Sequence, residues 1–137
     1  MREKVKRTFL NFESAIENLK SAIKETTKES EINDLNVDGT IKRFELCYEL
    51  SWKMIKVYLE DLGIICKNPR DCYKQAKIND LIFNDEIWME MIDARNRLVH
   101  EYSLNFSRII FQNIVDKYFN VLEELYKEIK NRIEQDY

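Results

Sequence analysis

Residues 40–62, TIKRFELCYELSWKMIKVYLEDL, contain neither proline nor glycine and decide the fold class of this chain. On a helix drawn at roughly 100° per residue, one thin polar stripe is made of Lys42, Glu45, Glu49, Lys53, Lys56 and Glu60. The other positions are mostly apolar and span an arc of roughly 200°, which one neighbouring helix cannot cover. We therefore expect a helix that is central in the fold, or that lies against a second subunit, and that ends at Gly63.

Hydrophobic spacing predicts another helix before this segment and a loop between the two. Apolar side chains recur at steps of three and four at Val5, Phe9, Phe12, Ile16, Leu19 and Ile23. Such a narrow stripe is typical of a helix that packs against an antiparallel neighbour. The polar run TTKESEINDLNVDG at 26–39 breaks the period, so we expect one long loop there, with Asp38 or Thr40 as the N-cap of the following helix.

Two short signals predict the starts of further helices. Asn68 precedes Pro69 and can cap a short helix that runs to about Lys77. Asn84 repeats the capping signal for a fourth helix. Its buried side is expected to hold Trp88, Met91, Ile92, Leu98 and Val99.

A long final helix is predicted after Ser103 or Asn105. Its inner face is marked by Ile110, Ile114, Tyr118, Val121, Leu122, Leu125 and Ile129. The 137 residues include only two glycines and one proline, too few turn residues for a sheet protein. We expect a single all-α domain over residues 1–137, an up-and-down bundle of about five helices. The glycines allow no phosphate-binding loop, which excludes P-loop and Rossmann enzymes.

Charge and composition argue against several classes of function. The 22 Lys and Arg residues against 25 Asp and Glu residues give a net charge of −3, so nothing global indicates a nucleic-acid binder. A local basic run at 67–77 is expected to be a solvated helix face, with a phosphate-facing patch as the alternative. The N-terminal segment lacks the apolar core of a signal peptide, and no stretch is long and apolar enough to span a membrane. We expect a cytoplasmic protein.

The three cysteines, Cys47, Cys66 and Cys72, form no C-x-x-C motif. We expect them to be unpaired thiols, as is usual in a reducing cytosol. Together with the single histidine they lack the spacing of zinc ligands, so we expect neither a metal nor another cofactor.

The fourth predicted helix carries an arginine within its apolar stripe. Arg95 falls about 20° from Trp88 on a helical wheel, and a buried arginine requires a partner because desolvating its charge costs several kcal/mol. Asn96 and His100 are four residues apart and can touch on a polar edge beside the stripe, close to Asp93. Arg95 and His100 are about 140° apart on an ideal helix. A shared site therefore needs a helix that ends or distorts near His100, long side-chain reach, or a second subunit, which we prefer.

Ordinary structural roles remain open for these residues. A histidine at a helix end is often a C-terminal cap favoured by the helix dipole, which is one role open to His100. Arg95 could extend its guanidinium to the solvent or form an interface ion pair. Tyr102 would ordinarily be a core aromatic with its hydroxyl at the edge.

The octapeptide RNRLVHEY at 95–102 has the pattern R-N-x-x-x-H-x-Y and resembles the signature of the HEPN superfamily, small helical proteins paired with minimal nucleotidyltransferases. The stretches KRFE at 42–45 and YELSWK at 48–53, with matching residues at 58–63 and 68–92, resemble the nucleotidyltransferase substrate-binding protein family. The resemblance covers nearly the whole chain and implies a HEPN-like bundle.

This resemblance implies one of two functions. In the first, the chain is the helical partner of a separately encoded minimal nucleotidyltransferase and binds nucleotide or presents the substrate to it. In the second, it is a metal-independent endoribonuclease toxin, silenced when the nucleotidyltransferase adenylylates Tyr102. For cleavage, His100 would transfer a proton near neutral pH, Arg95 would hold phosphate oxygens and Asn96 would orient His100 or bind substrate. A mechanism with two histidines would need a dimer.

A third interpretation is a non-catalytic helical interaction module, in which Arg95 pairs with an acid such as Asp93 of another subunit. We favour the nucleotidyltransferase partner, as a homodimer with Arg95, Asn96 and His100 at or near a cleft between subunits, where nucleotide or RNA would bind. Arg43 and Arg70 are weaker candidates for phosphate contact.

Overall fold

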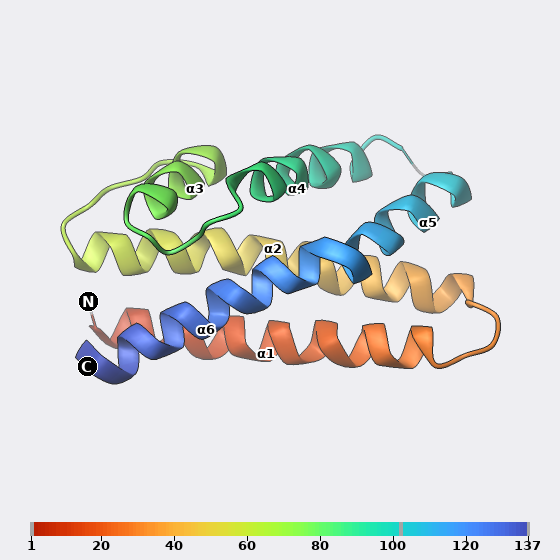
Figure 1. The fold of residues 1–137 in the computed structure, drawn as a ribbon, viewed down its shortest axis with the longest axis horizontal. Helices are drawn as coiled ribbons and strands as arrows, with labels where there is room; N and C mark the ends of the chain where they lie inside the picture. Colours follow the sequence, from red (N-terminus) through yellow and green to blue (C-terminus); the bar gives the residue numbers. More distant parts are fainter. Residues whose placement is uncertain (1, 102, 137) are drawn as a thin grey trace.

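Every regular element of the computed structural model, which describes residues 2–101 and 103–136, is helical (Figure 1). The helices are α1 (Arg2–Thr27), α2 (Asp34–Asp61), α3 (Pro69–Ile78), α4 (Asp85–Leu98), α5 (Leu104–Asn113), the π-helical turn η1 (Ile114–Tyr118) and α6 (Phe119–Asp136). Because α5, η1 and α6 follow one another without a break, they form the long final helix that the sequence predicts. The expected all-α bundle of about five helices is confirmed.

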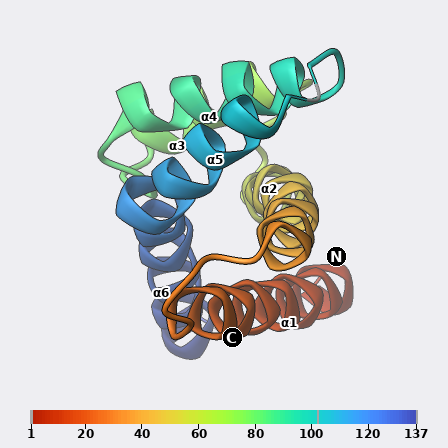
Figure 2. The ribbon, with the colours of Figure 1, turned by 90° about the vertical axis from the view of Figure 1, so that its right-hand side faces the viewer.

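α2 is the central helix of the bundle. It packs against α1 along its length and also contacts α3, α5 and α6, and Figure 2 shows these helices arranged around it at different sides. Its buried side chains include Phe44, Cys47, Tyr48, Met54, Ile55, Tyr58 and Leu59. Most of the wide apolar arc is therefore covered within one chain, as expected of a central helix, although Leu46 is exposed.

The start of α2 differs from the prediction. Asn33 caps the helix, since its Oδ1 accepts hydrogen bonds from the backbone N–H groups of Leu35 (2.7 Å) and Asn36 (3.4 Å). The predicted loop at 26–39 and the predicted N-cap at Asp38 or Thr40 are wrong, and only 28–33 link α1 to α2. Gly39 lies inside the helix, where an added Cβ would meet no described atom within 4 Å.

Buried threonines explain why the polar run at 26–39 is largely helical. The hydroxyl of Thr26 on α1 lies 3.1 Å from that of Thr40 on α2. Each also donates to a carbonyl four residues earlier in its own helix, Thr26 to Ala22 and Thr40 to Asn36, both at 2.8 Å. These contacts satisfy the polar groups that α1 and α2 bury where they meet, so tertiary packing extends both helices beyond their hydrophobic pattern.

Most other helix ends are confirmed. Gly63 has φ of +84° and follows the end of α2, as expected of a residue that can adopt the left-handed conformation. Asn68 Oδ1 accepts from the N–H of Asp71 at 2.9 Å, and Pro69 is the first residue of α3. Ser103, one of two predicted caps, accepts from the N–H of Phe106 at 3.1 Å. Asn84 precedes α4, but among the described residues its side chain forms no capping hydrogen bond.

The inner faces predicted for α4 and for the final helix are buried, with one exception. All seven positions named on the final helix are buried, and so are Trp88, Met91, Ile92 and Leu98 of α4. Val99 is 46% exposed, so the expectation that it is buried is wrong. The physical reason is that α4 ends at Leu98, and Val99 begins the turn that leaves the helix.

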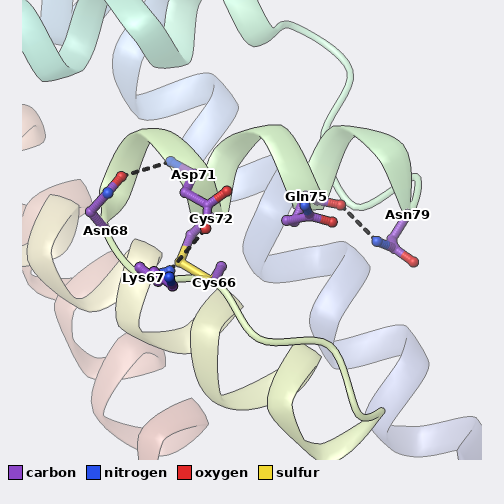
Figure 3. The surroundings of a disulfide bond; sticks show 7 residues. All are labelled: Cys66, Lys67, Asn68, Asp71, Cys72, Gln75 and Asn79. Carbon is purple, nitrogen blue, oxygen red and sulfur yellow. Dashed lines mark hydrogen bonds between the residues drawn. A yellow bond between two sulfur atoms is a disulfide. The ribbon is translucent and has the colours of Figure 1, made fainter.

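The cysteines also differ from the prediction. Cys66 and Cys72 form a disulfide with their Cα atoms 5.0 Å apart, because the turn before α3 brings the two residues together (Figure 3). In the same turn the N–H of Lys67 donates to Asp71 Oδ2 at 3.0 Å. Cys47 is a free thiol in the core, and burial raises its pKa well above the ordinary range. The expectation of three unpaired thiols is wrong for two of them, so the cysteines give no argument for a reducing compartment.

Candidate functional site

The C-terminal end of α4 is an open turn. The N–H of Val99 donates to the carbonyl of Asn96, and the N–H groups of His100 (3.0 Å) and Glu101 (2.9 Å) both donate to the carbonyl of Arg97. The helix therefore ends two residues before His100. This is one of the three conditions under which Arg95 and His100 were expected to share a site.

Arg95 faces an acid of α2, as the sequence requires. Its Nε lies 3.8 Å from Glu49 Oε1, and the side chain is 31% exposed. Within the part of the chain that the structure describes, this buried Nε has no hydrogen-bond partner. Glu49 is held in turn by Trp52, whose Nε1 donates to Glu49 Oε2 at 3.2 Å. The distance between these two atoms is too long for a hydrogen bond. Glu49 therefore orients Arg95 but leaves the hydrogen-bonding capacity of its Nε unused.

His100 lies in a hollow with Asn96, Arg97 and Glu101. All four side chains are exposed. Asn96 and His100, which the sequence predicts can touch, therefore line the same hollow. Arg95 lines a different hollow, with Lys42, Arg43, Glu45, Leu46 and Glu49.

A third hollow shares lining residues with the first two. It is lined by Asp38, Ile41, Lys42, Glu45, Leu98, Val99, Glu101, Leu104 and Ser107. It shares Lys42 and Glu45 with the hollow of Arg95, and Glu101 with that of His100. We call the residues that line these three hollows the α2–α4 face. Three large apolar side chains of this face are exposed, Leu46, Val99 and Leu104.

The two weaker phosphate candidates lie in different places. Arg43 lines the same hollow as Arg95, and its Nη1 donates to the backbone carbonyl of Asn18 at 2.9 Å. Arg70 on α3 lies beside Asp93, with a guanidinium nitrogen 4.0 Å from Oδ1. Among the residues that the structure describes, Arg70 is outside the α2–α4 face.

A buried polar cluster fixes α2 against α3 behind Arg95. The hydroxyls of Ser51 and Tyr73 are 3.1 Å apart, and the ring of Tyr48 packs edge-on against that of Tyr73. Burial raises the pKa of Tyr48 to about 12; Glu49 adds to this rise and Arg95 opposes it. Burial also raises the pKa of Tyr73 well above its ordinary value. Both phenols therefore stay neutral near pH 7, and they hold in place the helix that carries Glu49.

Sequence reasoning missed three residues of this region. Glu49 is assigned to the solvated stripe of α2, and no local signal relates it to Arg95. Arg97 and Glu101 belong to the octapeptide at 95–102, and their spacing of four residues is a signal for the ion pair that they form at 2.9 Å. The predicted modification site, Tyr102, lies outside the described residues.

The described residues hold neither a metal-binding cluster nor a membrane-spanning helix. Within 2–101 and 103–136, no group of three His, Cys, Asp or Glu side chains is arranged to hold a metal ion. In the same ranges, no helix has the combined length and apolar character needed to cross a membrane.

The chain matches a known protein family and resembles a solved structure. A family model described as nucleotidyltransferase substrate binding protein like matches residues 7–131. A crystal structure of a protein from Thermus thermophilus superposes with a TM-score of 0.72 at 27% sequence identity, covering 86% of this chain and 98% of that one. A search of curated proteins gave no match.

Proposed function

The chain belongs to the nucleotidyltransferase substrate binding protein-like family, and from this we propose that it is the helical partner subunit of a separately encoded minimal nucleotidyltransferase. In this role it binds nucleotide or presents the substrate to the enzyme. The observation that carries the proposal is the family match over 7–131, which includes both α2 and the octapeptide around Arg95. The half-buried pair of Arg95 and Glu49 supplies a phosphate-binding group at the α2–α4 face.

Arg95 is suited to hold a phosphate. Its guanidinium is planar, permanently charged and able to donate two parallel hydrogen bonds to an anion. Glu49 acts as a positioning residue, because it lies beside Nε at 3.8 Å without forming a hydrogen bond to it. Asn96 and His100 offer polar groups in the adjoining part of the same face. Arg43 would contribute positive charge, whereas Arg70 would act outside this face.

The test is co-expression with the nucleotidyltransferase encoded beside this gene. We expect the two chains to co-purify, and AMP to bind the complex more weakly when Arg95 is replaced by alanine. Arg7→Ala, which changes an exposed arginine of α1, is the matched control and should bind AMP as the wild type does. If no nucleotidyltransferase co-purifies, or if Arg95→Ala and Arg7→Ala bind AMP equally well, the proposal fails.

The proposal includes a homodimer that pairs through exposed apolar side chains of the α2–α4 face and leaves Arg95, Asn96 and His100 at a cleft between the subunits. Its exposed apolar side chains, Leu46, Val99 and Leu104, support a covered surface. Light scattering coupled to gel filtration should give the mass of a dimer for the wild type and of a monomer for Leu46→Glu. Leu10→Glu, at an exposed leucine of α1, is the control and should remain a dimer. A monomeric wild type would remove this part of the proposal.

A metal-independent ribonuclease toxin is the second candidate, favoured by the hollow that Asn96, Arg97 and His100 share. Here His100 would transfer the proton and Arg95 would stabilise the phosphate charge. Growth arrest and RNA degradation on induction, both abolished by His100→Ala, would establish it. Mass measurement after co-expression would then detect an adenylyl group on Tyr102. Normal growth and intact RNA with a co-purifying nucleotidyltransferase would leave the partner function alone.

A further inference from the structure

Arg97 makes two side-chain contacts to which neither proposed function assigns a role. Its Cζ lies 4.4 Å from the centroid of the Phe106 ring, across the turn between α4 and α5. Its Nη2 donates to Glu101 Oε2 at 2.9 Å. Phe106 is 3% exposed and fixed in the core, so the guanidinium rests on an immobile ring and is fastened at one edge.

This arrangement leaves one surface of Arg97 free. Phe106 covers one face of the guanidinium and Glu101 occupies part of its hydrogen-bonding edge. Since the side chain is still 61% exposed, the face opposite Phe106 is open to solvent. A guanidinium clamped on an aromatic ring loses little further freedom when another flat group stacks on that face.

The open face suits a nucleobase better than a phosphate. A phosphate would need the edge of the guanidinium, where the Glu101 carboxylate already binds and would repel a second anion. A base carries no net charge and presents a π face, and bases stack on arginine planes in single-stranded nucleic-acid complexes.

We propose that Arg97, backed by Phe106, is a stacking platform for a nucleobase. The inference rests on the proposed function, because it deepens the binding site of the same α2–α4 face. Arg97 shares a hollow with Asn96 and His100, and a third hollow shares lining residues both with that one and with the hollow of Arg95. The ligand chemistry is a base joined to a phosphate, carried by a free nucleotide or by a single strand of RNA.

The test compares two fluorescein-labelled probes of equal charge by anisotropy, using the full chain. One is hexaadenylate RNA and the other is a hexamer of abasic sites. Arg97→Lys keeps the charge but removes the plane, so we expect the Kd for hexaadenylate to rise at least about fivefold, the lower end of what base stacking contributes. The Kd for the abasic hexamer should change by less than about twofold, because counterion release depends on charge alone.

Two further variants separate stacking from charge and from folding. Arg7→Lys, on the first turns of α1, should leave both Kd values unchanged. Phe106→Leu keeps an apolar side chain in the core while removing the ring, and should also weaken hexaadenylate more than the abasic probe. Thermal unfolding of each variant shows whether it keeps the fold. If Phe106→Leu is unfolded, the Arg97→Lys comparison alone decides the test.

Competition with AMP distinguishes the two sources of the base. If AMP displaces hexaadenylate from the wild type, and displaces it less well from Arg97→Lys, the platform binds a free nucleotide. Binding of hexaadenylate without displacement by AMP assigns it to a strand, and both results support the inference. Equal losses on the two probes, or no binding of hexaadenylate by the wild type, would overturn it. If Arg95→Ala weakens AMP binding while Arg97→Lys has no effect on either probe, the platform is wrong and the proposed function stands.

Discussion

The two turns that flank the α3–α4 pair are built in opposite ways. The turn into α3 is closed by the disulfide between Cys66 and Cys72 and by the Asn68 cap, and the buried Tyr73 directly follows Cys72 in α3. The turn out of α4 exposes His100 and its neighbours, and among the described residues it is held by the contacts of Arg97 with Glu101 and Phe106 and by the Ser103 cap. We call these regions the closed joint and the open joint.

The difference separates stability from recognition. Buried rings, a covalent bond and satisfied hydroxyls raise the cost of opening the closed joint, whereas an exposed turn contributes little to the free energy of unfolding. Side chains that bind ligands have to be accessible to solvent. They therefore lie at the open joint, which costs less free energy to open, and rest on rigid elements. Changes at the closed joint should therefore lower stability, and changes at the open joint should alter binding.

The largest effect is expected from Tyr73→Ala. The ring is fully buried against Tyr48 and Trp88, so its loss should lower the free energy of unfolding by about 3–5 kcal/mol. His100→Ala, at the exposed end of α4, should change it by less than about 0.5 kcal/mol. Urea denaturation followed by circular dichroism measures both. Similar losses at the two positions would contradict the contrast between the joints.

Removing the disulfide should have the next largest effect. The double variant Cys66→Ala, Cys72→Ala frees a short loop in the unfolded chain, and loop entropy predicts a loss of about 2 kcal/mol. Treating the oxidised wild type with a thiol reductant is the matched control, and its urea midpoint should fall toward that of the variant. An unchanged midpoint in both samples would show that the buried contacts alone close this joint.

Alkaline pH should weaken the closed joint through Tyr48. The pKa of Tyr48 is raised to about 12 in the folded chain, mainly by burial, against about 10 in the unfolded chain. Its stabilisation is complete below about pH 10 and is lost as the pH rises to 12, on the order of 1 kcal/mol per pH unit, because the unfolded chain releases the proton first. Urea midpoints measured from pH 8 to 11 should fall less steeply in Tyr48→Phe, and parallel curves would exclude Tyr48 as a cause.

The smallest effect is expected at the open joint. Glu101→Gln removes an exposed ion pair with Arg97, four residues apart on the surface, which contributes less than about 0.5 kcal/mol. The midpoint of urea unfolding should hardly move, and adding salt to the wild type should reproduce the small change. A loss above about 1 kcal/mol would mean that the contacts of Arg97 also stabilise the fold. The two joints would then not differ in their contribution to stability.

Local patterns predict most of the fold because they report helix faces and caps directly. The apolar stripe of the final helix and the cap at Asn68 follow from spacing alone. The start of α2 at Asn33 does not, because contacts between Thr26 and Thr40 join two helices and leave no mark on hydrophobic periodicity.

The site is predictable to a lesser degree for the same reason. A buried arginine requires a partner, and the octapeptide places Asn96 near His100. The identity of that partner as Glu49 depends on how α4 lies across α2, which spacing within one helix cannot give. The disulfide likewise depends on the path of a turn, since three cysteines allow more than one pairing.

Gly39 is a position at which a substitution should raise the thermal stability of this chain. No described atom stands within 4 Å of where its Cβ would be, and the residue lies inside α2. A glycine there costs roughly 1 kcal/mol relative to alanine, and this penalty serves no packing purpose. An engineered Gly39→Ala chain should gain that margin and tolerate harsher substitutions elsewhere, which would make it the better parent for dissecting the rest of the molecule.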